Sequence, residues 1–268
     1  MLSAIILTLD EERHLPDCLA SLTWADEIVV FDSFSADRTC ELARNFGARV
    51  VQHRFENYAR QRNAALEAVE ADWVFFLDAD ERATPAVGAE ILQVARHDAI
   101  GPRRSAAERH LRAASSTANR AGGWIPRHNY IFGRLTLHAG WYPDYQMRLL
   151  RRGRARYVPE RPVHELVELD GAEWYLHNPL VHLNYDTVAE FIAKQHEYAA
   201  YDASVLHRRG WRPRPHHFLS APVRQFYWRF FTLHGYRAGW HGLKLSGLMA
   251  YFEWVKFRQL SRGHTMPT

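Results

Sequence analysis

The sequence lacks both common phosphate-binding loops. Neither G-x-G-x-x-G nor G-x-x-x-x-G-K-[ST] occurs in its 268 residues, so neither a Rossmann dinucleotide site nor a P-loop is supported. Only two cysteines are present, Cys18 and Cys40, and they have neither C-x-x-C nor metal-ligand spacing. No disulfide framework is implied, and a reducing compartment fits the chain.

Long hydrophobic runs are also missing. No stretch of 18 apolar residues exists, which argues against a membrane span. The first nine residues lack a basic region and lead directly into Asp10, so we do not expect a signal peptide. A composition of 47% hydrophobic and 24% charged residues is that of an ordinary globular protein.

Acidic residues are sparse in the second half of the chain. The net charge is only +4, but Asp and Glu are densest before residue 100, whereas Arg, His and Lys dominate afterwards. We therefore expect the second half to face something anionic.

Apolar runs alternate with helical patterns through the first 80 residues. Four runs are typical of strands, at residues 2–9, 27–31, 48–53 and 73–77. Three segments between them are typical of helices, at residues 11–22, 39–46 and 58–69. This order predicts an α/β fold with a parallel sheet and right-handed crossovers.

The strand at residues 73–77 is the one around which the chain is organised. Its five bulky apolar residues suit burial on both faces, and Asp78, Asp80 and Glu81 then follow abruptly. If the chain stays extended, Asp78 and Asp80 project to the same side and can share a hard cation. Ligands bind at the carboxyl ends of such strands, although a solvated turn is the other interpretation of so short a pattern.

A phosphatase of the haloacid dehalogenase type is a further alternative, since it also places D-x-D after an apolar strand. That motif normally follows the first strand and continues to Thr or Val. Here it follows the fourth strand and continues to Glu81 and Arg82.

Several motifs, in this order, resemble glycosyltransferase family 2. They are Glu11-Glu12 after the first strand, residues 28–39, residues 61–63 and residues 76–81. The branch that the chain most resembles includes the β-glucosyltransferases of lipopolysaccharide inner-core assembly. The resemblance covers most of the chain and implies a GT-A fold, a Rossmann-like, mostly parallel sheet flanked by helices. It also implies a nucleotide-sugar donor and a divalent ion, Mg²⁺ or Mn²⁺.

The resemblance, together with a helical pattern from about Thr187 onward, gives a domain plan. We expect a GT-A catalytic domain in residues 1–186 and a C-terminal helical region in residues 187–268. Within the catalytic domain, residues 1–95 would bind the nucleotide sugar and residues 123–186 the acceptor. Residues 96–122, rich in Arg, Ala and Ser, suggest a surface excursion with a short helix near 106–114.

Site residues are carried over from the family motifs by position. For the metal ion they are Asp80, with Asp78. For the donor they are Thr8, Asp32, Arg62, Asn63, Asp78 and Arg148, of which Asp32 resembles the residue that holds the uracil base.

The catalytic base is predicted from its place downstream of D-x-D. Glu165 occupies the position at which inverting members carry a carboxylate, but many relatives have Glu-Asp there, whereas this chain has His164-Glu165. Asp144 is therefore the rival. A zinc site at His164, His177 and His182 is disfavoured because H-E-x-x-H is absent.

The C-terminal third interleaves aromatic and basic residues, including Arg224, Arg229 and Lys244, and its last helix has an apolar stripe from Leu245 to Val255. Such a stripe can pack on the catalytic domain, bind nucleic acid or lie in a membrane interface. We favour docking of residues 213–260 on an anionic membrane surface, at the cytoplasmic face, without nucleic acid as a partner.

The predicted function is an inverting transferase that moves a sugar, with UDP-glucose as the preferred donor, to a glycan or lipid-linked acceptor such as lipopolysaccharide core. The alternative is a basic and aromatic nucleic-acid-binding module without turnover. Tight oligonucleotide binding with a steep salt dependence would distinguish that module.

Overall fold

The computed structural model describes residues 1–99, 119–159 and 166–262. The chain forms two compact units. The first unit is Met1–Arg127 with Tyr145–His182, and the second unit is His128–Asp144 with Leu183–Thr268. The predicted domain boundary after residue 186 lies close to Leu183, where the second segment of the second unit begins. The assignment of residues 1–186 as the catalytic domain stays a prediction.

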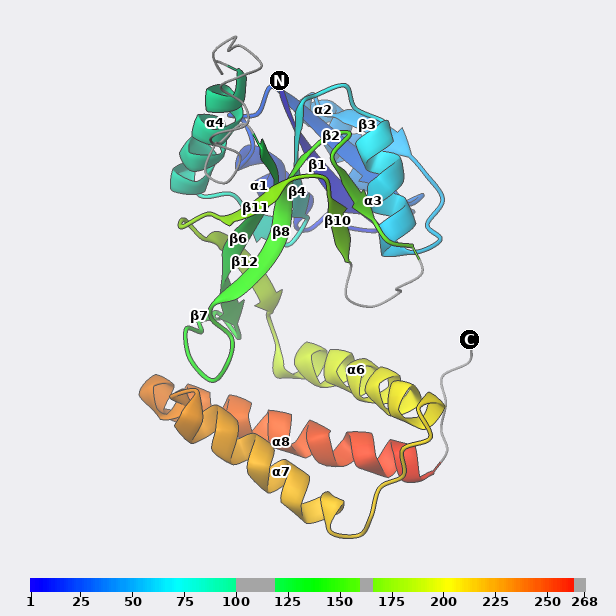
Figure 1. Cartoon of the computed structure of the whole chain (residues 1–268), viewed down its shortest axis with the longest axis vertical. Helices are drawn as coiled ribbons and strands as arrows, with labels where there is room; N and C mark the ends of the chain where they lie inside the picture. The colour runs from blue at the N-terminus through cyan, green and yellow to red at the C-terminus, as the bar shows by residue number, and fades with distance from the viewer. Residues whose placement is uncertain (100–118, 160–165, 263–268) are drawn as a thin grey trace, which may run out of the picture. The chain divides into compact units, whose positions relative to one another are not determined.

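Strands and helices alternate at the beginning of the chain, as the pattern predicts (Figure 1). These elements are β1 (Leu2–Thr8), α1 (Leu15–Ala20), β2 (Glu27–Asp32), α2 (Thr39–Phe46), β3 (Arg49–Gln52), α3 (Tyr58–Glu67), β4 (Trp73–Asp78), β5 (Glu81–Arg82) and α4 (Pro85–Ala99). Further strands follow, namely β6 (Arg120–Ile131), β7 (Arg134–Leu135), β8 (Asp144–Arg151), β9 (Ala155–Tyr157), β10 (Val167–Leu169), β11 (Ala172–Tyr175) and β12 (Leu180–Tyr185).

The main sheet has the order β3-β2-β1-β4-β8-β6-β12-β5, with β7 and β11 paired to β6. The strands β3, β2, β1 and β4 are parallel, and β8 adds to β4 in the antiparallel direction. This confirms the predicted α/β class with a mostly parallel sheet flanked by helices.

Apolar side chains on both faces of β4 explain its central place. Trp73, Phe75 and Leu77 lie in a core cluster with residues of α1 and α4, whereas Val74 and Phe76 lie in a second cluster with residues of α3. Figure 1 shows α3 and α4 on opposite sides of the sheet. A strand buried on both faces holds its carboxyl end in a fixed position.

The first helix begins later in the sequence than predicted. The prediction placed it at residues 11–22, but α1 begins at Leu15. The backbone N–H groups of Asp10, Glu11 and Glu12 donate instead to side chains of the loop after β2 and of the start of α2. The predicted excursion at 96–122 lies largely outside the described residues, between α4 and β6.

Helices make up most of the second unit. They are α6 (Val188–Arg208), α7 (His217–Tyr227), the π-helical turn η2 (Trp228–Thr232), the 3₁₀ turn η3 (Gly235–Ala238) and α8 (Gly239–Ser261). Leu245, Phe252 and Val255 of α8 pack with Phe191 of α6 in a buried cluster. The apolar stripe of the last helix is therefore core and cannot contact a membrane, whereas the predicted docking of residues 213–260 as a whole stays a prediction. Among the described residues, none of the helices has the length and hydrophobicity that crossing a bilayer requires.

A close approach of α8 to η3 gives a prediction. A Cβ on Gly242 would lie 1.9 Å from the backbone oxygen of Gly235, whereas a Cβ on Gly247 meets nothing within 4 Å. We expect Gly242→Ala to lower the free energy of unfolding by about 1 to 3 kcal/mol or more. Gly247→Ala on the same helix should raise it by about 0.5 to 1 kcal/mol. Urea unfolding measures both, and equal stabilities would contradict this packing.

Candidate active site

Three predicted site residues lie at the carboxyl ends of neighbouring parallel strands. Thr8 ends β1, Asp32 ends β2 and Asp78 ends β4. The strand register pairs Thr8 with Asp32 and Leu7 with Asp78. Carboxyl ends of parallel strands meet at one edge of a sheet, which is where open α/β folds bind ligands. The structure therefore brings these three residues together, as the sequence predicts.

The carboxylate of Asp32 is buried and saturated with donors. It accepts hydrogen bonds from the hydroxyl of Thr8 (3.0 Å), from the backbone N–H and hydroxyl of Ser35, and from Nε2 of Gln52 (3.3 Å). Burial alone would raise the pKa of Asp32, but the hydrogen bonds, above all those from Ser35, lower it. Asp32 is therefore a fixed anion with all its acceptor positions in use.

The loops after β1 and β2 hold one another. The backbone N–H of Asp10 donates to Ser35 Oγ, and the backbone N–H of Ala36 donates to Asp10 Oδ1. Asp10 and Phe34 have left-handed backbones, with φ of 55° and 64°. Such conformations cost about 1 kcal/mol or more for residues other than glycine and cluster at functional sites. Phe34 is 58% exposed at the edge of the Asp32 site.

Asp78 is held by two arginines. Arg148 donates through both Nη1 and Nη2 to the two carboxylate oxygens, and Arg62 Nη2 donates to Oδ1 at 3.3 Å. Burial would raise the pKa of Asp78, but the charges of Arg148 and Arg62 outweigh it and hold the pKa well below its usual range. Arg62, Arg148 and Asp78, all predicted donor residues, thus form one ionic cluster.

Glu81 completes this cluster, and the sequence prediction gave it no role in the site. Its side chain is fully buried and accepts from Arg148 Nη2 at 2.9 Å and from Arg127 Nη1 at 3.0 Å. It also accepts from the backbone N–H of Asp78 at 3.0 Å. Glu81 therefore fixes both the backbone of Asp78 and the guanidinium that binds its carboxylate. The one signal in the sequence is a third carboxylate directly after D-x-D.

Two of the predicted donor residues, Arg62 and Asn63, lie on α3. The guanidinium of Arg62 is 5.1 Å from the ring centroid of Phe76 and 5.7 Å from that of Tyr157. Both ends of the Asn63 amide bind the backbone of Tyr157, at 2.8 and 2.9 Å. Asn63 thus attaches β9 to α3, and its predicted contact with the donor stays a prediction.

Asp80 lies in a turn. The chain turns at Ala79 and Asp80, so the extended geometry that would place Asp78 and Asp80 side by side is not formed. Asp80 Oδ2 instead lies 3.4 Å from Nε2 of His182, a residue that the sequence prediction left without a role. The described residues contain no group of three His, Cys, Asp or Glu side chains that could hold a metal ion.

Negative charge gathers near Asp80. Burial, followed by the charges of Asp80 and Asp37, raises the pKa of Glu11 to about 7. Glu11 belongs to the Glu11-Glu12 motif after β1, and its backbone N–H donates to Thr39 Oγ1 at 2.8 Å. The charges of Asp80 and Asp37 add to the larger effect of burial, and a cation near Asp80 would lower the pKa of Glu11 again.

Of the two candidates for the catalytic base, only Asp144 lies within the described residues. Glu165, with His164, lies outside the described residues. Asp144 belongs to the second unit, where its Oδ2 accepts from Nδ2 of the buried Asn129 at 3.0 Å. Asn129 also donates to the backbone oxygen of Trp141 at 2.9 Å. Asp144 is therefore held in place by an amide that is itself fixed.

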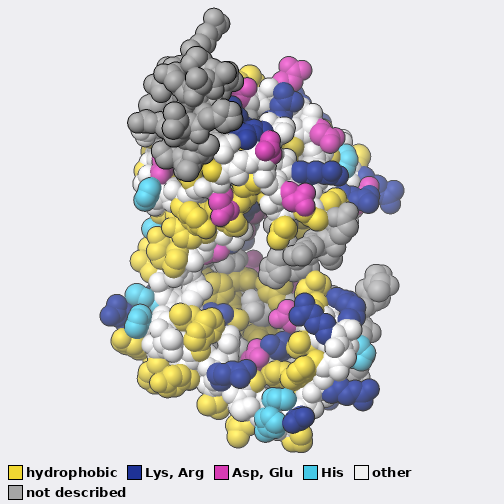
Figure 2. All heavy atoms as spheres, viewed as in Figure 1, with side chains coloured by type: hydrophobic (Ala, Val, Ile, Leu, Met, Phe, Trp, Pro, Cys, Tyr) yellow, Lys and Arg dark blue, Asp and Glu magenta, His cyan; other side chains and the backbone are white. Residues whose placement is uncertain are grey.

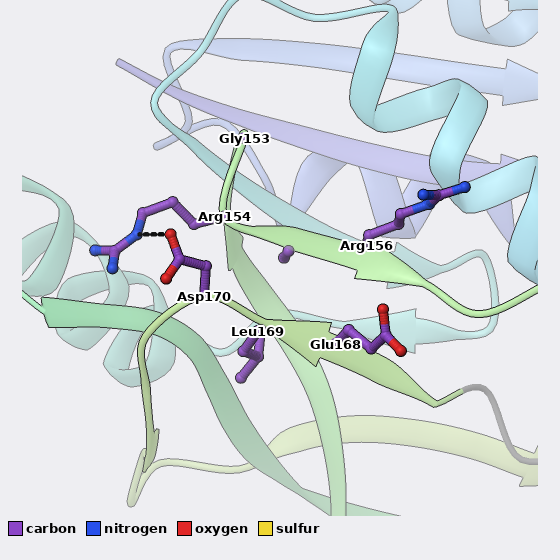
Figure 3. A pocket seen from close by; sticks show the side chains of 7 residues that line it. Gly153, Arg154, Arg156, Glu168, Leu169 and Asp170 are labelled. Carbon is purple, nitrogen blue, oxygen red and sulfur yellow. Dashed lines mark ion pairs between the residues drawn. The ribbon is translucent and has the colours of Figure 1, made fainter.

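A separate hollow lies on the β9–β10 hairpin (Figure 3). It has a volume of about 340 Å³ and is lined by Arg154, Arg156, Glu168, Asp170 and their neighbours. The guanidinium of Arg154 points to the carboxylate of Asp170, at 3.6 Å. None of its lining residues is a predicted site residue, and its charges include both signs, so it gives no functional signal.

Comparison with known proteins decides the family. The model of the family described as "Glycosyl transferase family 2" matches residues 3–153, more than half of the chain, and this match includes Asp32, Asp78 and Arg148. The chain belongs to this family. The predicted enzyme class is thereby confirmed at the level of a glycosyltransferase.

Curated relatives agree with this assignment. The lipopolysaccharide core biosynthesis glycosyltransferase LpsC of Rhizobium meliloti (strain 1021) is 28% identical over 277 residues, which cover 99% of this chain and 93% of that protein. An uncharacterized glycosyltransferase of Rickettsia bellii (strain RML369-C) is 34% identical over 91 residues, covering 34% of this chain and 31% of the relative. The match to LpsC covers nearly the whole length of both proteins.

Solved structures show weaker likeness. The S. aureus TarS structure has a TM-score of 0.42 at 17% identity and covers 97% of this chain and 55% of that one. Glucosyl-3-phosphoglycerate synthase of Mycobacterium tuberculosis, in complex with Mn²⁺, UDP and glucosyl-3-phosphoglycerate, has a TM-score of 0.28 at 29% identity. That match covers 30% of this chain and about a third (34%) of the synthase. The family assignment therefore depends on the family model.

The buried cluster around Glu81 gives a prediction. Glu81→Gln leaves the guanidiniums of Arg127 and Arg148 without one of their charge partners, so we expect the free energy of unfolding to fall by about 3 kcal/mol. Glu41→Gln on the exposed side of α2 is the control and should change it by less than about 0.5 kcal/mol. Urea unfolding at pH 7 compares the two. Similar stabilities would show that Glu81 does not hold the arginines.

Proposed function

We propose that this family 2 glycosyltransferase is an inverting enzyme that transfers a sugar from a nucleotide diphosphate donor, UDP-glucose by preference, to a lipid-linked or oligosaccharide acceptor. The observation that carries the proposal is the D-x-D segment at the carboxyl end of β4, where two arginines orient Asp78. The acceptor class is supported by LpsC, a lipopolysaccharide core biosynthesis enzyme that matches 99% of the chain.

The nucleotide would bind beside Asp32. A buried carboxylate that stays ionised can accept an N–H of a uracil base. Its acceptor positions are already in use, so binding must displace one donor. The hydrogen bond from Gln52 is the longest at 3.3 Å, and we expect this one to be replaced. The exposed ring of Phe34 borders the same place.

A divalent ion fits the residues near the turn after β4. Asp80 is 36% exposed, and its Oδ2 lies beside Nε2 of His182, so one carboxylate oxygen and one imidazole nitrogen converge. A carboxylate oxygen suits both Mn²⁺ and Mg²⁺, which commonly keep several positions for water and substrate phosphates. An imidazole nitrogen suits transition metals better than Mg²⁺, so this pair favours Mn²⁺ of the two. When bound, the ion would stabilise negative charge on the leaving diphosphate.

Side chains of the protein would orient the donor and accept the proton of the acceptor hydroxyl. Arg148 and Arg62 hold Asp78 in one orientation, in which it can accept from a ribose hydroxyl. The acceptor hydroxyl must lose a proton to a carboxylate about 3 Å away. Glu165 is our first candidate for this base, and Asp144 is the second. Attack from the face opposite the diphosphate inverts the anomeric carbon.

We further propose that the reaction takes place on a lipid-linked acceptor at the cytoplasmic face of a membrane. The support is the lipopolysaccharide role in the name of LpsC together with the basic C-terminal third of this chain. The nucleic-acid alternative without turnover is disfavoured, because the family match identifies residues 3–153 as a glycosyltransferase.

Metal-dependent donor binding is the first test of this proposal. Calorimetric titration of UDP should give an affinity in Mn²⁺ at least about tenfold above that in EDTA, since an ion held by Asp80 would neutralise charge on the diphosphate. Asp80→Ala should bind UDP equally weakly in both buffers. Asp170→Ala, whose side chain is 85% exposed, is the control and should behave as wild type. Equal affinities for wild type in both buffers would refute the metal role.

The base and the stereochemistry form a second test. We expect Glu165→Gln to lower kcat by about 10² to 10⁴-fold with unchanged UDP affinity, because the base acts only in the transition state. Glu168→Gln, an exposed neighbour, should keep normal turnover. The anomeric coupling of the product, measured by NMR, should show a β-linkage from an α-linked donor. If Asp144→Asn loses turnover and Glu165→Gln keeps it, Asp144 is the base.

A further inference from the structure

An apolar stripe remains exposed along α7 and η2. Leu219 is 73% exposed, Val223 58%, Tyr227 61% and Phe231 49%. These residues recur every four positions, so they lie along one side of the helix and its π-helical continuation. The rings of Tyr227 and Phe231 are 5.1 Å apart, which makes the end of the stripe continuous.

The stripe is separate from the core of the second unit. The opposite face of α7 supplies Ala221, which is 2% exposed and packs with Phe257 and Leu260 of α8. The apolar stripe of α8 is itself buried against α6. Among the described residues, α7 and η2 therefore carry apolar side chains that are not buried in the core of the second unit. Scattered exposed apolar residues are ordinary, but an aligned row marks an interaction surface.

The part of the chain that contains the stripe is rich in positive charge. Residues 203–262 contain a single acidic residue, Glu253, and its carboxylate is 2.7 Å from Lys256. The same residues contain eleven Lys and Arg, namely Arg208, Arg209, Arg212, Arg214, Arg224, Arg229, Arg237, Lys244, Lys256, Arg258 and Arg262. Arg224 is exposed and directly follows Val223. Figure 2 shows dark-blue and yellow side chains intermingled over this helical part of the molecule.

Two of the cations that sequence reasoning grouped with the membrane surface make contacts within the second unit. Arg229 donates to the backbone oxygen of Ala139 at 2.7 Å and lies 5.6 Å from the ring centroid of Trp141. Lys244 lies 4.5 Å from the ring centroid of Phe132. The cations nearest to the stripe in sequence are Arg224 and those of residues 208–214, which precede α7 and are exposed.

We propose that the α7–η2 stripe, formed by Leu219, Val223, Tyr227 and Phe231, docks on the surface of an anionic phospholipid bilayer. Aliphatic and aromatic side chains in a row, bordered by arginines, match the boundary between acyl chains and anionic headgroups. A second copy of this chain would bring the same positive charge to the interface and be repelled. A nucleic acid would match the positive charge. Its bases stack on aromatic rings, however, and would make no such contact with the aliphatic side chains of Leu219 and Val223.

This inference identifies the face through which the enzyme would reach a lipid-linked acceptor, and it does not depend on sugar transfer. Docking is measured without donor or acceptor. UDP binding, measured on the same samples, reports on the proposed function separately. A protein that binds vesicles but not UDP would overturn only the transferase mechanism.

Co-sedimentation with vesicles tests the proposal. The full chain is mixed with vesicles of phosphatidylglycerol and phosphatidylcholine, or of phosphatidylcholine alone, at low and at physiological salt. We expect binding to the anionic vesicles only, weakened by salt. Leu219→Gln with Tyr227→Gln should weaken binding about tenfold or more. Arg224→Gln should weaken it about fivefold at low salt.

Matched controls lie on α6 of the same unit. Ile192 is 36% and Tyr198 50% exposed, so Ile192→Gln with Tyr198→Gln removes the same kinds of side chain from another surface. Lys194→Gln is the corresponding control for charge. All variants change exposed positions, and circular dichroism and UDP binding should be those of wild type. Normal vesicle binding by both controls supports the proposal.

Three outcomes would overturn the proposal. The first is wild-type protein that stays in the supernatant with anionic vesicles at low salt. The second is an equal loss of binding in the α6 controls, which would show that the α7–η2 stripe has no special part. The third is a wild-type dimer, seen by analytical ultracentrifugation, that the Leu219 and Tyr227 changes dissociate, because the stripe would then bind a second copy.

Discussion

The ion pair between the buried Arg148 and the partly exposed Asp78 is the interaction on which the first unit's site depends. Transfer of a charge from water into a protein costs several kcal/mol unless partners surround it. Here Glu81 supplies the second anion, and Arg127 and Arg62 supply the further cations. These five side chains come from β4, β5, β8, β6 and α3, so the cluster connects elements that are distant in sequence.

The cluster is therefore both a structural support and a functional constraint. Asp78 sits at the end of a strand that is buried on both faces, and its backbone is bound by Glu81. Its carboxylate has little freedom to rotate, because Arg148 contacts both oxygens. A group fixed before the ligand arrives loses no further entropy on binding. Asp32 shows the same principle with neutral donors in place of arginines.

The sequence predicted those features that follow from local periodicity. The runs ending at Thr8, Asp32 and Asp78 are apolar on both faces, so the strands and the edge that they share follow from the order of residues alone. Contacts between segments far apart in the chain could not be predicted in this way. Glu81 looked like part of a solvated turn, and its burial depends on Arg127 and Arg148, which lie 46 and 67 positions away. The turn at Asp80 likewise depends on tertiary contacts.

The C-terminal helices show a second limit of periodicity. An apolar stripe on a helix indicates that something covers it, but the pattern is the same for a protein core and for a membrane. The stripe of α8, with Leu245 and Phe252, is covered by α6, whereas that of α7, with Leu219 and Val223, stays exposed. Helix α7 also contains Pro222, which weakens its signal as a helix. Only the packing of the helices shows which apolar stripe stays exposed and can bind a partner. The scarcity of acidic residues near the α7 stripe then indicates that this partner is anionic.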